Sequence, residues 1–144
     1  MILVDSSVWI AAWRGSDAET VAQLTQLIER ETVAINWLIR TELLQGARDR
    51  THARTVQRLL EPIPVIPFPD ALWDAAPGFY LECRQAGVTL TTIDSLIATH
   101  VKVARYQLWS LDHIFTKIPH FSSHAYDGCS NSHRNAAMLT RRSR

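Results

Sequence analysis

Four acidic residues stand at positions where carboxylates could share a metal ion. Asp5 and Asp112 each follow a short apolar run, at residues 2–4 and 108–111, and Asp94 stands near the start of an apolar periodic segment. Glu42 lies between two pairs of apolar residues. Two ionised carboxylates about 4 Å apart repel by roughly 4 kcal/mol at an effective dielectric constant near 20, so acids that share a cleft need a cation.

The ligand atoms indicate which cation and which reaction to expect. Carboxylate oxygens favour Mg²⁺, with Mn²⁺ as the alternative, over zinc. A divalent ion of this kind lowers the pKa of a bound water, and a second ion can stabilise the leaving oxygen of an in-line displacement. The four acids therefore predict metal-assisted cleavage of phosphodiesters without a protein nucleophile.

Hydrophobic periodicity predicts alternating strands and helices along the chain. Short apolar runs predict strands at residues 2–4, 33–35, 65–66 and 108–111. Helical spacing predicts helices at residues 17–31, 37–45, 51–61 and 70–86, and from Thr91 or Thr92 to about residue 101. This order predicts an α/β fold, a three-layer α/β/α sandwich with a short parallel central sheet.

Parallel strands end at a common edge of the sheet, where open α/β sheets bind their ligands. Asp5 and Asp112 follow two of these strand ends, and Asp94 begins a helix that starts from the same edge. Glu42 is not placed by this argument, because its helix could run with either end near the edge. The sequence predicts that three acids converge, with Glu42 as the fourth candidate.

The segment at residues 70–86 contains Pro77 followed by Gly78. Proline inside a helix removes one hydrogen bond and costs about 3 kcal/mol or more. We therefore expect this segment to form two helical pieces.

Length and composition predict a single domain in a reducing compartment. The 144 residues are 47% hydrophobic and 20% charged, and the two cysteines, Cys83 and Cys129, do not form a disulfide framework. No apolar run approaches the roughly 18 residues that a membrane helix needs, so we expect a cytoplasmic protein without a membrane partner.

The small net charge of +1 conceals two parts of opposite sign. Residues 122–144 carry four arginines and one acid, a net charge of +3, whereas residues 1–121 have a net charge of −2. We expect a nuclease domain at residues 1–121 and a polar, basic C-terminal tail at residues 122–144 that is poorly ordered.

Four segments together resemble the PIN-domain ribonucleases, especially the VapC toxins of bacterial toxin–antitoxin pairs. These segments are ILVDSSVWI, TELLQGA, GVTLTTIDSLIATHV and LWSLDHIF, and the resemblance runs from Met1 to about Phe121. Two features depart from the family pattern. Pro77 and Gly78 interrupt a helix that is normally continuous, and the final stretch lacks a clear closing strand.

The resemblance implies a PIN-like fold in which Asp5, Glu42, Asp94 and Asp112 bind Mg²⁺ or Mn²⁺ to cleave RNA. Ser110 matches a small polar residue that supports the metal site, and Ser6 follows the first acid in a similar way. The resemblance also implies a homodimer and a cognate VapB-like antitoxin whose peptide occupies the active-site groove.

Simpler and competing interpretations accompany each motif. A single acid at a strand end or helix start is usually a cap, which applies most directly to Asp94. Tryptophans in apolar segments usually belong to the core rather than to an RNA-stacking surface, and arginines such as Arg40 are usually solvated. A zinc site at His120, His124, Cys129 and His133 lacks the usual ligand spacing.

Other functional classes remain as alternatives. A serine nucleophile at Ser6 or Ser7 lacks the G-x-S-x-G setting. A receiver domain or a haloacid-type phosphatase would need further acids where Ser6 and Ser7 stand. The leading alternative is a catalytically inactive PIN-like module that binds RNA or protein.

Overall fold

The computed structural model describes residues 1–121 and 123–124. These residues form a five-stranded sheet in the order β3-β2-β1-β4-β5, and every neighbouring pair is parallel. The strands are β1 (Ile2–Val4), β2 (Val33–Asn36), β3 (Val65–Ile66), β4 (Gln107–Trp109) and β5 (Ser123–His124). The first strand of the chain is therefore the central one, and the acid that follows it lies at the middle of the sheet edge.

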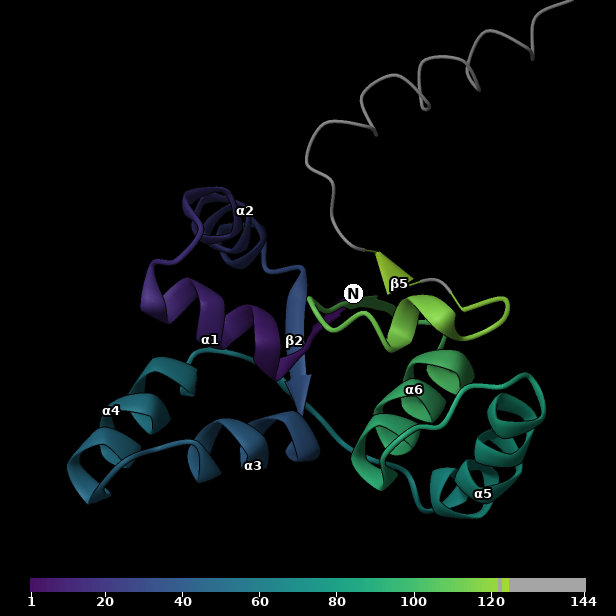
Figure 1. Cartoon of the computed structure of the whole chain (residues 1–144). Coiled ribbons are helices and arrows are strands. Elements are labelled where there is room, and N and C mark those ends of the chain that lie inside the picture. The colour runs from purple at the N-terminus through teal and green to yellow at the C-terminus, as the bar shows by residue number, and fades with distance from the viewer. Residues whose placement is uncertain (122, 125–144) are drawn as a thin grey trace, which may run out of the picture.

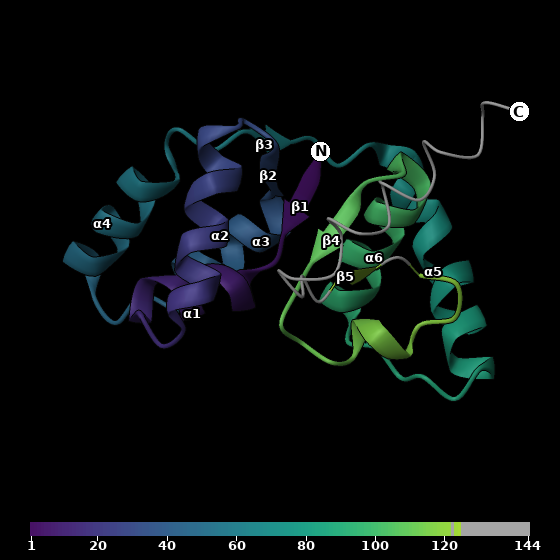
Figure 2. The ribbon, with the colours of Figure 1, turned by 90° about the horizontal axis from the view of Figure 1, so that it is seen from above.

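Helices cover both faces of the strands, as Figures 1 and 2 show from two directions. The helices α1, α2 and α4 lie on one side, and α5 and α6 lie on the other. Their bounds are α1 (Ser6–Arg14), α2 (Ala18–Glu29), α3 (Trp37–Gln45), α4 (Arg50–Leu60), α5 (Asp70–Gln85) and α6 (Thr92–Ala104), with a 3₁₀ turn η1 (Phe115–Lys117). The predicted α/β/α architecture is confirmed.

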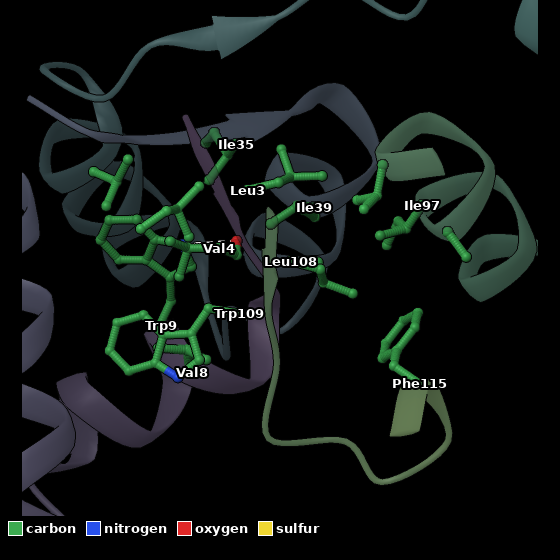
Figure 3. Packing of buried hydrophobic residues seen from close by; sticks show 14 of the residues in the cluster. Leu3, Val4, Val8, Trp9, Ile35, Ile39, Ile97, Leu108, Trp109 and Phe115 are labelled. Carbon is green, nitrogen blue, oxygen red and sulfur yellow. Dashed lines mark hydrogen bonds between the residues drawn. The ribbon is translucent and has the colours of Figure 1, made fainter. Parts of the chain in front are cut away.

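The core forms where strand residues meet the helices on the two faces (Figure 3). Leu3, Ile35 and Leu108 from three neighbouring strands are fully buried. The indole nitrogen of Trp9 on α1 donates a hydrogen bond to the carbonyl of Val4 at 3.1 Å, which joins the first helix to the central strand. Trp9 therefore belongs to the core, as most tryptophans in apolar segments do.

Side-chain caps determine where the helices begin. Asp5, Asp17, Asn36, Asp49 and Thr91 each accept a hydrogen bond from a backbone N–H in the first turn of the helix that follows. Such caps satisfy N–H groups that have no partner inside the helix. Asp5 and Asn36 stand where β1 and β2 give way directly to α1 and α3, so the edge of the sheet is itself built from capping residues.

Helix α5 corrects the expectation of two pieces, because it runs without interruption through Pro77 and Gly78. Proline at position 77 removes only the N–H that would bond to the Trp73 carbonyl. The buried residues of α5 lie on both sides of the proline. These are Leu72, Ala76, Phe79 and Cys83, of which Phe79 and Cys83 belong to the main hydrophobic cluster. Burial of this common face outweighs the lost hydrogen bond.

The end of the described chain corrects a second expectation. Residues Ser123 and His124 form β5, which pairs with β4 in the register Leu108↔Ser123 and Trp109↔His124. A short closing strand is therefore present where the sequence showed none clearly. Residue 122 and residues 125–144 lie outside the described residues, and with them the expected character of the tail, Cys129 and His133.

The lengths of the helices also bear on membrane insertion. Across residues 1–121 and 123–124, no helix combines the length and the apolar composition needed to cross a membrane.

Candidate active site

Asp5 forms the centre of a hydrogen-bonded cluster at the carboxyl end of β1. It is only 5% exposed, and its Oδ2 atom accepts hydrogen bonds from the Ser7 backbone N–H at 3.2 Å and from the Ser7 hydroxyl. The hydroxyl of Ser110, which directly follows β4, donates to the same oxygen at 2.9 Å. Three donors from two neighbouring strand ends thus fix the orientation of the Asp5 carboxylate.

Glu42 reaches the same edge from α3. The hydroxyl of Ser6 donates a hydrogen bond to Glu42 Oε2 at 3.0 Å, across 36 positions of sequence. Ser6 is the residue after Asp5, so this bond places the glutamate beside the start of α1. The structure therefore assigns Ser6 to Glu42, and it is Ser7 and Ser110 that contact Asp5.

Asp94 lies in the first turn of α6 and forms a capping box with Thr91. Its Oδ2 atom accepts hydrogen bonds from the Thr91 backbone N–H at 3.3 Å and from the Thr91 hydroxyl at 2.6 Å. The Asp94 backbone N–H in turn donates to the Thr91 hydroxyl at 3.1 Å. The capping interpretation of Asp94 is thus correct, and it fixes one oxygen of the carboxylate while the other stays free of these bonds.

Asp112 is exposed and less closely tied to the other acids. Its backbone N–H donates to the Ser110 hydroxyl at 3.0 Å, and its Oδ1 atom accepts from the Ile114 backbone N–H at 2.9 Å. The link to Asp5 therefore passes through Ser110. No hydrogen bond joins the Asp112 carboxylate to the other three acids in the part of the chain that the structure describes.

The four carboxylates share one property. Each uses a single oxygen for its protein hydrogen bonds, and the second oxygen has no donor among the described residues. For residues 1–121 and 123–124, no buried side-chain nitrogen or oxygen lacks a hydrogen bond. The free Oδ1 of Asp5 must therefore reach solvent, although its residue is almost buried. One oxygen of each acid positions the group and the other is open to a ligand.

The negative charges of the carboxylates repel one another at this edge of the sheet. Burial raises the pKa of Glu42, the Ser6 hydrogen bond opposes that rise, and the negative charges of Asp5 and Asp94 add to it. The two ion pairs found among the described residues, Arg48–Asp49 and Lys102–Glu82, include none of the four acids. No ion pair within the described residues therefore offsets the repulsion at Glu42.

The chemistry of the donor set fits a hard divalent cation, because the free atoms are carboxylate oxygens. In the positions that the side chains take, no group of three or more His, Cys, Asp or Glu residues within the described ranges is arranged to hold a metal ion. Asp94 is bonded to Thr91 in its capping box, and Asp112 is bonded to the Ile114 backbone N–H two residues ahead. The structure bonds Asp5 to Ser110 and bonds Glu42 to Ser6, the residue after Asp5. The charges of Asp5 and Asp94 both act on Glu42, and the Asp112 carboxylate is linked to Asp5 only through Ser110.

Sequence reasoning missed the buried polar link behind the acids. Asn36 is fully buried, and its Oδ1 accepts from the Ile39 backbone N–H at 2.9 Å. Its Nδ2 lies 3.3 Å from His100 Nδ1 on α6. Burial lowers the pKa of His100, which favours the neutral ring. Because an amide NH₂ group can only donate, Nδ1 is the acceptor in this hydrogen bond. One side chain thus joins the helix that carries Glu42 to the helix that carries Asp94.

The sequence indicates only one half of this link. The asparagine before an apolar helical run predicts the cap. Nothing in the local sequence indicates that His100, 64 positions away, accepts from the same amide.

Comparison with known proteins identifies relatives of this chain. Residues 2–120 match the family model described as PIN domain. Ribonuclease VapC11 of Mycobacterium tuberculosis is 34% identical over 102 residues, which cover 68% of this chain and 76% of that protein.

Solved structures share the fold at lower identity. A chain of VapBC2 from Rickettsia felis, bound to a DNA fragment from its promoter, matches with a TM-score of 0.74 and 20% identity over 86% of this chain and 98% of that one. A chain of DNA-bound VapBC from Salmonella typhimurium matches with a TM-score of 0.70 and 14% identity over 85% and 96%.

Proposed function

The chain belongs to the PIN-domain family as a VapC-type ribonuclease, the toxin of a toxin–antitoxin system, and from this premise we propose that Asp5, Glu42, Asp94 and Asp112 form its metal-dependent catalytic site. The cation proposed is Mg²⁺, with Mn²⁺ as a substitute. The substrate is RNA, whose phosphodiester bond is cleaved by water.

One observation carries the proposal. Each of the four carboxylates is oriented through one oxygen and keeps the other free of protein donors in the described part of the chain. A carboxylate whose sole role is to cap a helix does not require other carboxylates close to it. Here the charges of Asp5 and Asp94 both act on Glu42.

The residues of the chain have distinct tasks in this reaction. Asp5 provides the best positioned oxygen, because Ser7 and Ser110 fix its carboxylate from two sides. Glu42 provides the group with the raised pKa, which can take a proton from water near the scissile phosphate. The Ser6 hydrogen bond opposes the rise in the Glu42 pKa and so favours the ionised carboxylate. When bound, the divalent ion would supply an acidified water and would neutralise charge on the phosphate.

Asp94 and Asp112 would complete the set from α6 and from the loop after β4. Both would turn a free oxygen toward the ion, Asp94 while its other oxygen stays with Thr91. Mg²⁺ binds through few carboxylates and retains several waters, so it does not require four simultaneous protein ligands.

The partners follow from the family. We propose a cognate VapB-like antitoxin, because the matched structures from Rickettsia felis and Salmonella typhimurium are toxin–antitoxin complexes. We also propose a homodimer, and we place the nuclease domain in residues 1–121 together with the closing strand β5 (Ser123–His124).

The test compares substitutions of the same kind at caps inside and outside the site. Asp5→Asn and Asp94→Asn should each lower RNA cleavage by about 100-fold or more, with reduced binding of Mn²⁺ measured by calorimetry. Asp17→Asn is the matched control, because Asp17 caps α2 away from the sheet edge and should leave both quantities unchanged.

Two outcomes would contradict the assignment. Full cleavage by Asp5→Asn and Asp94→Asn would show that these acids do not form the catalytic site. A wild-type protein that neither binds Mn²⁺ nor cuts RNA would instead support an inactive PIN-like binding module. The local hydrogen bonds that Asp94 forms with Thr91 and Asp112 forms with Ile114 favour this module as the second candidate.

A further inference from the structure

A groove of about 480 Å³ lies between α3 and α4 and ends at the start of β3. Its lining includes Trp37 and Arg40 from α3, and Arg54, Arg58 and Glu61 from the region of α4. We call these five residues, with the space between them, the basic groove. The groove is separate from the cluster of acids at the carboxyl ends of β1 and β4.

The basic groove carries an excess of positive charge. Three arginines surround it against one acid, Glu61. Arg54 and Arg58 are exposed and lie four positions apart on α4, so they project from the same side of that helix. The ion pairs in the described ranges do not include any of these three arginines. The groove therefore has guanidinium groups available for an anionic ligand.

An exposed aromatic ring completes the groove. Trp37 is 54% exposed, although tryptophan is usually well buried. The Arg40 guanidinium lies 5.3 Å from the centre of the Trp37 ring, which limits the freedom of both side chains. An aromatic face beside unpaired arginines is the combination that binds bases and phosphates of single-stranded nucleic acid.

Helix α3 relates the groove to the acids. Arg40 and Glu42 are two positions apart, which places them about 200° apart around the helix axis. Ile39 and Leu43 anchor the helix in the core between them, and Trp37 and Thr41 occupy the exposed side. A nucleic-acid chain that extends from the acids to the arginines has to cross α3, and a helix is about 10–12 Å wide.

We propose that the basic groove binds the single-stranded RNA substrate a few nucleotides away from the bond that is cut. This inference rests on the proposed function, because it takes RNA as the substrate of the acidic site. Arg54 and Arg58 contact phosphates, and Trp37 stacks on a base. The groove acts on substrate affinity and not on the chemical step.

The first experiment measures binding without metal and therefore without cleavage. A fluorescein-labelled single-stranded RNA of about 12 nucleotides is titrated with the full chain in EDTA at several salt concentrations, and anisotropy is recorded. The double variant Arg54→Gln/Arg58→Gln should bind about 10-fold more weakly, and its salt slope should fall by about 1.4, since each phosphate contact to a single strand contributes about 0.7. Trp37→Ala should weaken binding by about 5-fold.

The matched control is Arg30→Gln/Arg84→Gln, which removes two exposed arginines outside the groove. All variants keep the arginines after residue 121, so a contribution from those residues is the same throughout. The control should bind RNA within about twofold of the wild type. Thermal unfolding checks that each variant is folded, and Arg54→Lys/Arg58→Lys, which keeps the charge, should recover most of the affinity.

The second experiment uses cleavage of RNAs of decreasing length in Mg²⁺. The double variant should raise KM for long RNA and leave kcat unchanged, and the difference should vanish for fragments too short to cross α3. Unchanged affinity and salt slope in EDTA would overturn the proposal whatever the enzyme does in Mg²⁺. An equal loss in the control variant would overturn it too, as would loss of antitoxin binding with RNA binding intact, which would assign the groove to a protein.

Discussion

The two flanks of α3 carry opposite charges and are organised in different ways. On one flank, Glu42 is bonded to Ser6 and lies beside Asp5, whose carboxylate has three donors. On the other flank, Arg54 and Arg58 are exposed, and neither forms an ion pair within the described residues. The acidic flank is held by short side chains and fixed hydrogen bonds, whereas the basic flank relies on long side chains.

This difference corresponds to the demands of the two proposed tasks. A reacting group has to be positioned within a fraction of an ångström, and rigid neighbours provide that accuracy. A phosphate contact away from the reaction requires charge more than position. The same nine-residue helix serves both flanks, and it is anchored between them by Ile39 and Leu43.

The largest expected effect is on stability and comes from Asn36, which caps α3 between the two flanks. Asn36→Ala should lower the free energy of unfolding by about 2–4 kcal/mol, because it removes the α3 cap and leaves the buried His100 nitrogen without its partner. Urea unfolding measures the change. Asn36→Ser retains a capping oxygen and loses the His100 contact, so it should cost less than Asn36→Ala.

The outcome decides whether the two flanks are coupled. If Asn36→Ala changes the free energy of unfolding by less than about 0.5 kcal/mol, the contact between Asn36 and His100 does not stabilise α3. The two flanks then do not depend on this contact. The exposed cap variant Asp49→Ala, expected to cost about 1 kcal/mol, calibrates the scale.

A smaller effect is expected at Glu42, where the acidic flank repels itself. The folded state raises the pKa of Glu42 above its ordinary value of 4.5. Between 4.5 and the raised value the folded state binds more protons than the unfolded state, so stability falls as pH rises through that window. In EDTA at pH 7, Glu42→Gln should therefore raise the melting temperature by roughly 3 °C, about 1 kcal/mol.

The prediction for Glu42→Gln has a matched control variant and a result that would contradict it. Glu29→Gln, at an exposed position on α2, should leave the melting temperature nearly unchanged. If Glu42→Gln destabilises the protein in EDTA, the carboxylate is stabilised by its surroundings and the acidic flank does not need a cation.

The smallest effect is expected at Ser6, which moderates the acidic flank. The Ser6 hydrogen bond lowers the pKa of Glu42, so Ser6→Ala should raise that pKa further and move the pH midpoint of Mn²⁺ binding upward. Its cost in stability should be about 0.5 kcal/mol. Ser16→Ala, which removes an exposed hydroxyl bonded to a backbone carbonyl, should leave the Mn²⁺ midpoint in place.

Local sequence determined the positions of Asp5, Asn36 and Asp94. Asp5 and Asn36 each stand between a strand and the helix that they cap, and Asp94 lies in the first turn of α6, in a capping box with Thr91. Such caps depend only on neighbours within three or four residues, so their positions follow from the printed order of residues. The parallel sheet followed in the same way from the alternation of short apolar runs and helical periods.

Pro77 shows where local rules were insufficient. The predicted break depended on the cost of one missing hydrogen bond, whereas the continuous helix depends on buried residues on both sides of the proline. Packing on a common core is a property of the folded molecule, and no window of sequence contains it.

The fold class and most helix starts followed from the sequence alone, because they depend on short-range periodicity and capping, and Asp5, Asp94 and Asp112 were proposed as site residues from the same signals. The contacts of Ser6 with Glu42, of Ser110 with Asp5 and of Asn36 with His100 are visible only in the folded molecule. Each of these contacts joins residues at least 36 positions apart, and such contacts are created by the packing of helices on the sheet.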